Sequence, residues 1–194
     1  MPSILALFAF VLMVIGGYGY LNQPVQEPQW TRVIPGFAFS PYQKGQSPLK
    51  NTWPEAEEIS RDLALLAGKT QAIRTYSVAQ VFGDIPQLAK PFNINVAMGA
   101  WISADLASNT RELDRLIELV QPPPSNVVRL IVGNEVLLRK ELDKEQLLAY
   151  LDWVRARTDI PVSTAEPWHV WLKNPQLAEH VDYLAVHLLP FWEG

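Results

Sequence analysis

Short apolar segments alternate with amphipathic segments from Val33 to the end of the chain. The apolar, often β-branched runs predict six buried strands. These are Val33–Tyr42, Ala72–Ser77, Ile94–Ile102, Val127–Glu135, Val162–Glu166 and Tyr183–Phe191. Strands that are apolar on both faces and separated by helices indicate a parallel sheet covered by helices.

The intervening segments carry apolar residues at helical spacing. They predict helices over Trp53–Ala67, Ala79–Lys90, Leu106–Val120, a segment that begins at Asp143, and Trp168–Glu179. Thr52 with Glu55 and Asp143 with Gln146 have the spacing of capping boxes. Gly83 and Pro86 weaken the second of these helices and Pro175 weakens the last, because both residue types disfavour a helix interior.

The first 22 residues are of a different kind. Ile4–Leu21 carries no charged residue, which is long enough to predict a membrane-spanning helix and longer than the apolar core of most signal peptides. We favour an uncleaved anchor over a cleaved signal peptide. A buried core helix would need a polar face, which this segment lacks. Residues 23–32, with two prolines, then form a linker to a domain over residues 33–194.

Polar and aromatic residues gather where the predicted strands end. Examples are Tyr42, Tyr76, Trp101, Glu135 and His187. A site drawn from every strand is typical of a (β/α)₈ TIM barrel, whereas an open doubly wound sheet binds its ligand at one switch point. We therefore predict a barrel with about six of its eight βα units in this chain, preceded by one transmembrane helix.

Composition excludes several classes of function. The 194 residues carry a net charge of −4 without a basic cluster, which argues against nucleic acid as a partner. The chain has no cysteine, so disulfides and thiolate metal ligands are excluded. The three histidines show no metal spacing, and Glu166-x-x-His169 is an isolated half-motif at a strand end. We expect neither a metal nor a cofactor.

The segment Val127–Arg139, which reads VVRLIVGNEVLLR, carries the most specific chemical signal. It places Glu135 at the mouth of an apolar strand. Desolvation there would raise the pKa of the carboxyl group and favour its protonated form, as a general acid requires. The competing interpretation is a structural Glu paired with Arg139 or another basic residue.

Several segments together resemble glycoside hydrolase family 17, the β-1,3-glucanase family, and within it the bacterial β-1,3-glucan transglycosylases. The matching order is GFAFSPY, IRTYS, NVAMGAWIS, RLIVGNEVLLR, PVSTAEPWHVWL and VDYLAVHLLPFWEG. The resemblance covers about Arg32–Gly194. It implies a β-1,3-glucan oligosaccharide or polysaccharide as substrate. It also makes a fused or partner glycosyltransferase a candidate partner, because that bacterial branch is often fused to a family 2 glycosyltransferase.

The same resemblance implies roles for single residues. Glu135 matches the general acid/base, and Asn134 matches the asparagine that contacts the sugar 2-hydroxyl. The family's nucleophile is a second Glu in a segment resembling E-x-G-W-P-S, which this sequence does not contain. We therefore expect a piece of a longer enzyme, inactive by itself. The family's Tyr-Pro-Tyr ending of the sixth strand is altered here to Leu189-Pro190-Phe191.

Further candidates for substrate contact come from the strand ends. Arg74 and Tyr76 could orient the nucleophile, although a structural role is equally open for Arg74. His187 could bond to substrate or to a catalytic carboxylate, or be a core histidine. Aromatic rings can stack on sugar faces or simply pack. The full set of substrate-binding candidates is Phe39, Tyr42, Arg74, Tyr76, Trp101, Asn134, Glu166, Trp168, His187, Trp192 and Glu193.

These observations predict a membrane-tethered, retaining β-1,3-glucan hydrolase or transglycosylase. We expect it to be anchored in the inner membrane through residues 4–21, with its domain on the periplasmic or extracellular side. Glu166 and Glu193 are weak rivals for the missing nucleophile. The alternative function is a non-catalytic glucan-binding or scaffolding barrel, which would lack the second carboxylate. A transporter is disfavoured because the chain has one hydrophobic segment.

Overall fold

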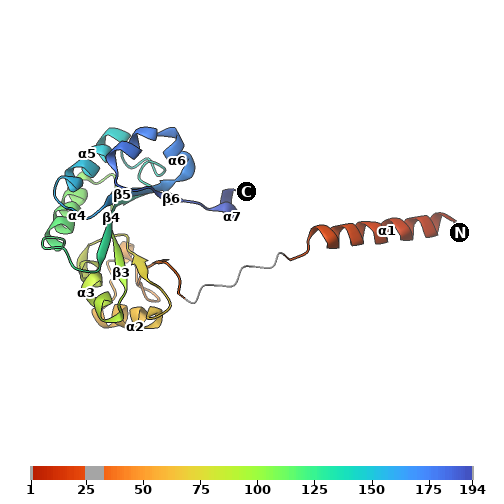
Figure 1. The fold of residues 1–194 in the computed structure, drawn as a ribbon, viewed down its shortest axis with the longest axis horizontal. Coiled ribbons are helices and arrows are strands. Elements are labelled where there is room, and N and C mark those ends of the chain that lie inside the picture. Colours follow the sequence, from red (N-terminus) through yellow and green to blue (C-terminus); the bar gives the residue numbers. More distant parts are fainter. Residues whose placement is uncertain (1, 25–32, 194) are drawn as a thin grey trace. The chain divides into compact units, whose positions relative to one another are not determined.

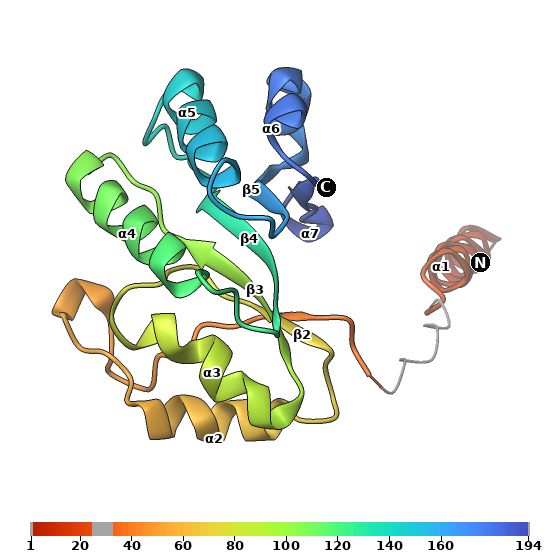
Figure 2. The ribbon, with the colours of Figure 1, turned by 60° about the vertical axis from the view of Figure 1, so that its left-hand side comes forward.

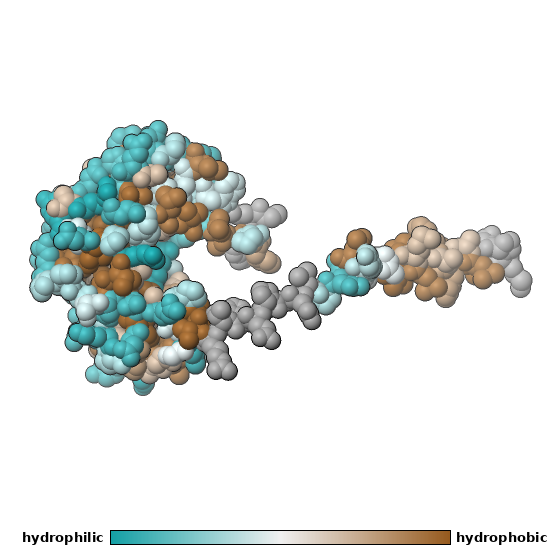
Figure 3. All heavy atoms as spheres, viewed as in Figure 1, coloured by the Kyte–Doolittle hydropathy of each residue, from teal (hydrophilic) through white to brown (hydrophobic). Residues whose placement is uncertain are grey.

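The computed structural model describes residues 2–24 and 33–193, which belong to two compact units, Met1–Thr31 and Arg32–Gly194. The first unit contains helix α1 (Pro2–Leu21). Its segment Ile4–Leu21 is long and apolar enough to cross a membrane, and no part of that segment is buried. Hydrophobic side chains cover most of α1 (Figure 3). A signal sequence near the N-terminus would have the same properties. Most of the predicted linker, residues 25–32, lies outside the described residues.

The second unit is built on one parallel six-stranded sheet (Figure 1). Its strands are β1 (Phe37–Ala38), β2 (Ala72–Arg74), β3 (Asn95–Ala100), β4 (Val127–Asn134), β5 (Val162–Pro167) and β6 (Ala185–His187). The strands pair in sequence order from β1 to β6. A doubly wound sheet reverses its strand order at a switch point. The strictly sequential order and the curl of the sheet instead fit part of a (β/α)₈ barrel.

Helices follow the strands and lie in an arc along one side of the curled sheet (Figure 2). They are α2 (Ala56–Leu66), α3 (Ile85–Ala89), α4 (Leu106–Leu119), α5 (Lys144–Arg155) and α6 (Trp168–Lys173). Short α7 (Pro190–Glu193) follows β6. Short 3₁₀ segments occur at Pro48–Lys50, Gln80–Asp84, Lys90–Phe92 and Pro175–His180. The two helices that contain internal Gly or Pro are thus broken into α and 3₁₀ pieces, as those residues predict.

The ends of two predicted strands are wrong. The predicted strand Val33–Tyr42 forms a ladder with β2 at Phe37–Ala38 and an isolated bridge from Ile34 to Thr70, and Pro35 and Pro41 flank the ladder. Proline has no N–H to donate to a ladder. The predicted strand Tyr183–Phe191 ends at His187, and Pro190 instead begins α7. Proline suits the first turn of a helix because its fixed φ matches the helical value.

One predicted helix cap is also wrong. The hydroxyl of Thr52 accepts a hydrogen bond from the Ser47 N–H at 2.8 Å, so it is engaged in a loop. The capping box of α2 is formed instead by Glu55 and Glu58. The second predicted box, Asp143 with Gln146, is confirmed at the start of α5.

The apolar core lies between the sheet and its helices. Fully buried side chains come from the strands and from one face of each long helix. They include Ile59, Leu63, Ile73, Met98, Leu116, Leu130, Leu147 and Leu151. Because this core fixes the strands from one side, the C-terminal ends of the strands hold their polar residues in set positions.

Candidate active site

The end of β4 carries a distorted turn that presents Glu135. The pairing of β4 with β5 shifts register between Ile131 and Asn134, and Gly133 has a φ of +83°. Glu135 has a φ of +56°, which is unusual for a residue with a side chain. Its N–H donates to the Ala165 carbonyl at 2.7 Å, and its carbonyl accepts from the Arg139 N–H at 2.8 Å. Bulges of this kind re-aim side chains next to active sites.

Four side chains from three strands meet at this turn. Nδ1 of His187 lies 2.7 Å from Oε1 of Glu135. Nη1 of Arg74 lies 2.9 Å from Nε2 of His187, and Nη2 of Arg74 donates to Oδ1 of Asn134 at 2.6 Å. A quarter of the Glu135 side chain is exposed. The carboxyl group is therefore both held in place and reachable by a substrate.

The Arg74 guanidinium is the central cation of this group. Burial lowers the pKa of Arg74 from its ordinary value, and the neighbouring Tyr76, Tyr183 and Glu135 act in the opposite direction. Its planar group also lies 4.8 Å from the centre of the Tyr76 ring. Burial raises the pKa of Tyr183, whose hydroxyl donates to the Leu130 carbonyl at 2.9 Å.

Glu166 lies beneath the turn and is completely buried. Its carboxylate accepts hydrogen bonds from the N–H groups of Leu137, at 2.8 Å, and Leu138, at 3.4 Å. Burial raises the pKa of Glu166, those two N–H groups act against the rise, and the Glu135 carboxylate adds to it. Glu166 therefore braces the segment that follows Glu135.

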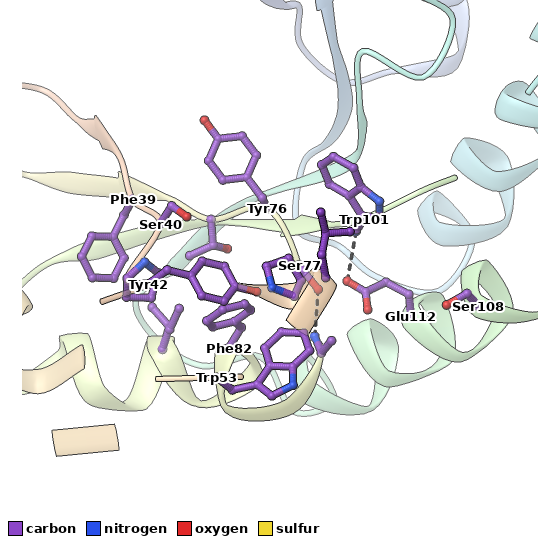
Figure 4. Close-up of a pocket in the computed structure, with 16 residues that line it drawn as sticks. Phe39, Ser40, Tyr42, Trp53, Tyr76, Ser77, Phe82, Trp101, Ser108 and Glu112 are labelled. Carbon is purple, nitrogen blue, oxygen red and sulfur yellow. Dashed lines mark hydrogen bonds between the residues drawn. The ribbon is translucent and has the colours of Figure 1, made fainter. Parts of the chain in front are cut away.

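A pocket opens beside the ends of β1, β2 and β3 (Figure 4). Its floor is an aromatic cluster of Tyr42, Trp53 and Phe82, whose ring centres are 5.2 to 6.0 Å apart. Phe39, Tyr76 and Trp101 also line it. Burial raises the pKa of the Tyr42 hydroxyl, which stays protonated and can donate a hydrogen bond. Tyr76 connects the pocket to Arg74.

Trp101 is held from two sides. The Arg139 guanidinium lies 4.5 Å from the centre of its ring, and the Glu112 carboxylate on α4 accepts from its backbone N–H at 3.0 Å. The same Glu112 oxygen accepts from the Val78 N–H at 2.8 Å. Arg139 also donates to the carbonyls of Asn134 and Ile102. The Arg139 side chain thus supports the turn and the tryptophan, and the Glu135 carboxylate pairs with His187.

The structure places the predicted site residues in three groups. Arg74, Asn134, Glu135 and His187 form one hydrogen-bonded network. Phe39, Tyr42, Tyr76 and Trp101 line the pocket. The other candidates lie elsewhere: Glu166 is sealed under the turn, Trp168 is half-exposed at the start of α6, and Trp192 and Glu193 lie in α7, where their side chains are outside the described residues.

Several residues of the site had no signal in the sequence. Trp53, Phe82 and Glu112 line the pocket, although they come from segments read only as helices. Glu112 and Arg115 are three residues apart on α4, and both bond to the loop after β2. That spacing places them on one helix face. Within residues 2–24 and 33–193, no group of three or more His, Cys, Asp or Glu side chains is arranged to hold a metal ion.

The sequence of the domain is similar to those of known proteins. Residues 36–194 match the model of the BtgE/BtgC glycoside hydrolase domain. Glucan endo-1,3-β-glucosidase btgC of Emericella nidulans is 27% identical over 180 residues, which cover 84% of this chain and 27% of that protein. Glucan 1,3-β-glucosidase of Schizosaccharomyces pombe is 28% identical over 150 residues, 71% of this chain and 47% of that protein.

A solved structure shares the fold. The glycoside hydrolase family 17 β-1,3-glucanosyltransferase of Rhizomucor miehei superimposes with a TM-score of 0.70 at 24% sequence identity, and the match covers 83% of this chain and 59% of that one. An active-site mutant of the same enzyme was solved with laminaritriose and matches equally well. The chain therefore spans only part of the length of the proteins that it matches.

Proposed function

Because the chain belongs to the BtgE/BtgC glycoside hydrolase domain family, we propose that it forms part of a retaining β-1,3-glucan hydrolase or transglycosylase with Glu135 as general acid/base. The family match and the curated relatives also confirm the resemblance to glycoside hydrolase family 17. We propose the activity, the substrate and the residue roles and do not carry them over from the relatives, because the match covers 27% of the relative from Emericella nidulans.

One observation carries this proposal: the partly exposed carboxyl group of Glu135 is hydrogen-bonded to His187 at 2.7 Å, beside Asn134, at the end of β4. A general acid/base must be reachable and held in one orientation. Asn134 is in turn fixed by Arg74. This supports Asn134 as a contact for a sugar hydroxyl next to the bond that is cleaved.

The proposed reaction needs a second carboxylate as nucleophile. In retaining glycosidases the two carboxyl groups lie about 5–5.5 Å apart. The second carboxylate attacks the anomeric carbon while Glu135 protonates the departing oxygen. Glu135 then takes a proton from the incoming water or sugar hydroxyl. Glu166 is unsuited to this attack because it is completely buried and engaged by two backbone N–H groups.

We assign the nucleophile to a part of the complete protein that lies outside these 194 residues. The 194-residue chain alone is then expected not to cleave laminarin. Whether water or a second sugar resolves the intermediate decides between hydrolysis and transglycosylation. The aromatic pocket beside the site favours a sugar acceptor, because aromatic rings bind the apolar faces of sugars while leaving little room for ordered water.

The pocket of Tyr42, Trp53, Tyr76 and Trp101 is proposed to bind glucosyl units of the chain. It is lined mainly by apolar and aromatic groups with a few polar ones, as sites for small molecules are. Tyr76 touches both the pocket and Arg74, so a glucan in the pocket would extend toward Glu135. Trp168, at the end of β5, is a candidate contact on the other side.

We further propose that α1 tethers the enzyme to a membrane or directs its export, with residues 33–194 outside the cytoplasm. The support is the uncharged segment Ile4–Leu21. As part of the same proposal, the membrane is the inner membrane and a glycosyltransferase is a partner of the enzyme. Protease treatment of intact spheroplasts should degrade the domain. Protection until the membrane is broken would contradict this orientation.

The catalytic proposal is tested with Glu135→Gln in the complete protein. Glu145→Gln is the matched control, because Glu145 is exposed on α5 and pairs with Lys144 at the surface. Loss of the acid/base group is expected to lower kcat on laminari-oligosaccharides by about 100-fold or more, with the control unchanged. Turnover by Glu135→Gln at the wild-type rate would contradict the assignment of Glu135 as general acid/base. Glucan binding without turnover by the wild-type protein would favour a non-catalytic binding domain.

A further inference from the structure

The hydrogen bonds around Arg74 have only one consistent direction. A guanidinium group can donate hydrogen bonds and cannot accept them. Its two terminal nitrogens lie 2.9 Å from Nε2 of His187 and 2.6 Å from Oδ1 of Asn134. Both of those atoms must therefore accept, which settles where the protons lie on the two neighbouring side chains.

For His187 the consequence is a single tautomer. Because Nε2 accepts from Arg74, it carries no proton, and a neutral imidazole then has its proton on Nδ1. Nδ1 lies 2.7 Å from Oε1 of Glu135, so the N–H donates to that oxygen. A doubly protonated imidazolium would point an N–H at the Arg74 cation, which the geometry opposes.

For Asn134 the consequence is the orientation of its amide. Oδ1 is occupied by Arg74, so the amino group is the end of Asn134 that can turn to a ligand. The asparagine then offers hydrogen-bond donors to a sugar oxygen. One cation thus determines the polarity of two different side chains at the site.

We propose that Arg74 is a positioning residue that sets the proton of His187 on Nδ1 and thereby makes Oε2 of Glu135 the acid/base oxygen. This rests on the proposed function of Glu135. His187 occupies Oε1 throughout and keeps its proton. Oε2–H donates its proton to the glycosidic oxygen as the bond from that oxygen to the anomeric carbon breaks and the electron pair stays on the oxygen. In the second half of the reaction, Oε2 takes the proton of the incoming hydroxyl. The oxygen of that hydroxyl bonds to the anomeric carbon as the bond from this carbon to the nucleophile carboxylate breaks, and the electron pair of that bond returns to the carboxylate.

The tautomer can be measured without any activity. The full chain, labelled with ¹⁵N-histidine in detergent micelles, gives an imidazole spectrum that distinguishes Nδ1–H, Nε2–H and imidazolium. The three histidines are assigned with His169→Gln, His180→Gln and His187→Gln. The wild-type spectrum at neutral pH is expected to show neutral His187 with the proton on Nδ1. An Nε2–H or imidazolium form would overturn the proposal.

Variants at two arginines test the cause. Arg74→Met removes the donor to Nε2 and is expected to release the tautomer, so that Nε2 becomes protonated in a large part of the population. Arg129→Met is the matched control, because its guanidinium lies against the Tyr183 ring, 5.1 Å from its centre. A His187 spectrum that is unchanged by Arg74→Met, or changed equally by both variants, contradicts the role of Arg74.

Kinetics of the complete protein tests the second half of the proposal. Glutamine can donate to Glu135 and accept from Arg74, whereas leucine can do neither. His187→Leu should lower kcat by about 10- to 100-fold with little change in KM, the effect of losing a hydrogen bond to a charged group. His187→Gln should recover most of that loss. Equal losses would overturn the positioning role. If Glu135→Gln kept full activity, the proposed function would fail while the tautomer result would stand.

Discussion

Oε1 of Glu166 accepts a hydrogen bond of 2.8 Å from the backbone N–H of Leu137, and this bond joins the buried interior of β5 to the turn that presents Glu135. The turn is therefore braced from below by Glu166 and from the side by His187. Removal of either brace should affect the position of Glu135, but the two should do so with different consequences for folding.

Replacement of Glu166 separates its hydrogen bonds from its charge. Glu166→Gln keeps an oxygen that can accept from Leu137. Glu166→Leu removes the acceptor of the part-buried N–H groups of Leu137 and Leu138, at a cost of about 1–3 kcal/mol in total. Urea unfolding should show a large loss of unfolding free energy for Glu166→Leu and a small change for Glu166→Gln. Equal stabilities would show that the bonds contribute nothing.

Stability should also depend on pH through Glu166. Its pKa is raised in the folded protein, mainly by burial, so the folded state binds a proton more tightly than the unfolded chain does. The stabilising contribution is thus complete below the unfolded pKa of about 4.3. It is lost as the pH rises through the folded pKa. The Tm of the wild type relative to that of Glu166→Gln should therefore fall as the pH rises. A constant difference from pH 4 to pH 8 would refute this.

The glycine before Asn134 should not tolerate a side chain. A Cβ at Gly133 would lie 2.5 Å from Cγ2 of Val136, and the φ of +83° disfavours any other residue. Gly45 has a similar φ of +88° with no atom within 4 Å of such a Cβ, so Gly45→Ala measures the backbone strain alone. Gly45→Ala should cost about 1–2 kcal/mol, and Gly133→Ala clearly more. Chemical denaturation of both variants checks this, and equal costs would mean that the contact relaxes freely.

Two tryptophans of equal exposure test the pocket. Trp101 is 42% exposed and lines the pocket, whereas Trp168 is 43% exposed and does not. Loss of a stacking ring should weaken binding of laminari-oligosaccharides by about 2- to 10-fold for Trp101→Ala. Trp168→Ala should have a smaller effect on short oligosaccharides. Titration calorimetry measures both affinities. An unchanged affinity in Trp101→Ala would remove the pocket from the proposed binding surface.

All six strands of the sheet could be predicted from their apolar runs, although β3, β4 and β5 are largely buried whereas both residues of β1 are exposed and β6 has no buried residue. The residues at which the strands end could not be predicted in this way. Pro41 and Pro190 signalled where pairing stops, and Pro35 interrupts the pairing between Ile34 and Phe37, but a hydrophobic pattern alone extends through all three. Helix α2 is capped by Glu55 and not, as predicted, by Thr52, because the Thr52 hydroxyl accepts a hydrogen bond from the Ser47 N–H. Such competition between neighbouring groups is decided by loop geometry.

The candidate site likewise has features that the sequence predicts and features that it does not. The convergence of Arg74, Asn134, Glu135 and His187 follows from the parallel order of the strands, since their C-terminal ends meet at one edge. The role of Glu112 could not be predicted from the sequence, because it is the packing of α4 that brings Glu112 to Val78 and Trp101. The direction of the hydrogen bonds at Arg74 likewise depends on distances that no sequence pattern contains.

The sequential strand order has a consequence for how the chain reaches its folded state. Each new strand pairs with the strand made immediately before it, from β1 to β6. No early strand has to wait for a late one to enter between it and its neighbour. A chain that emerges from a ribosome or a translocation channel with its N-terminus first can therefore add one βα step at a time to a growing edge. Synthesis and assembly can proceed in the same direction.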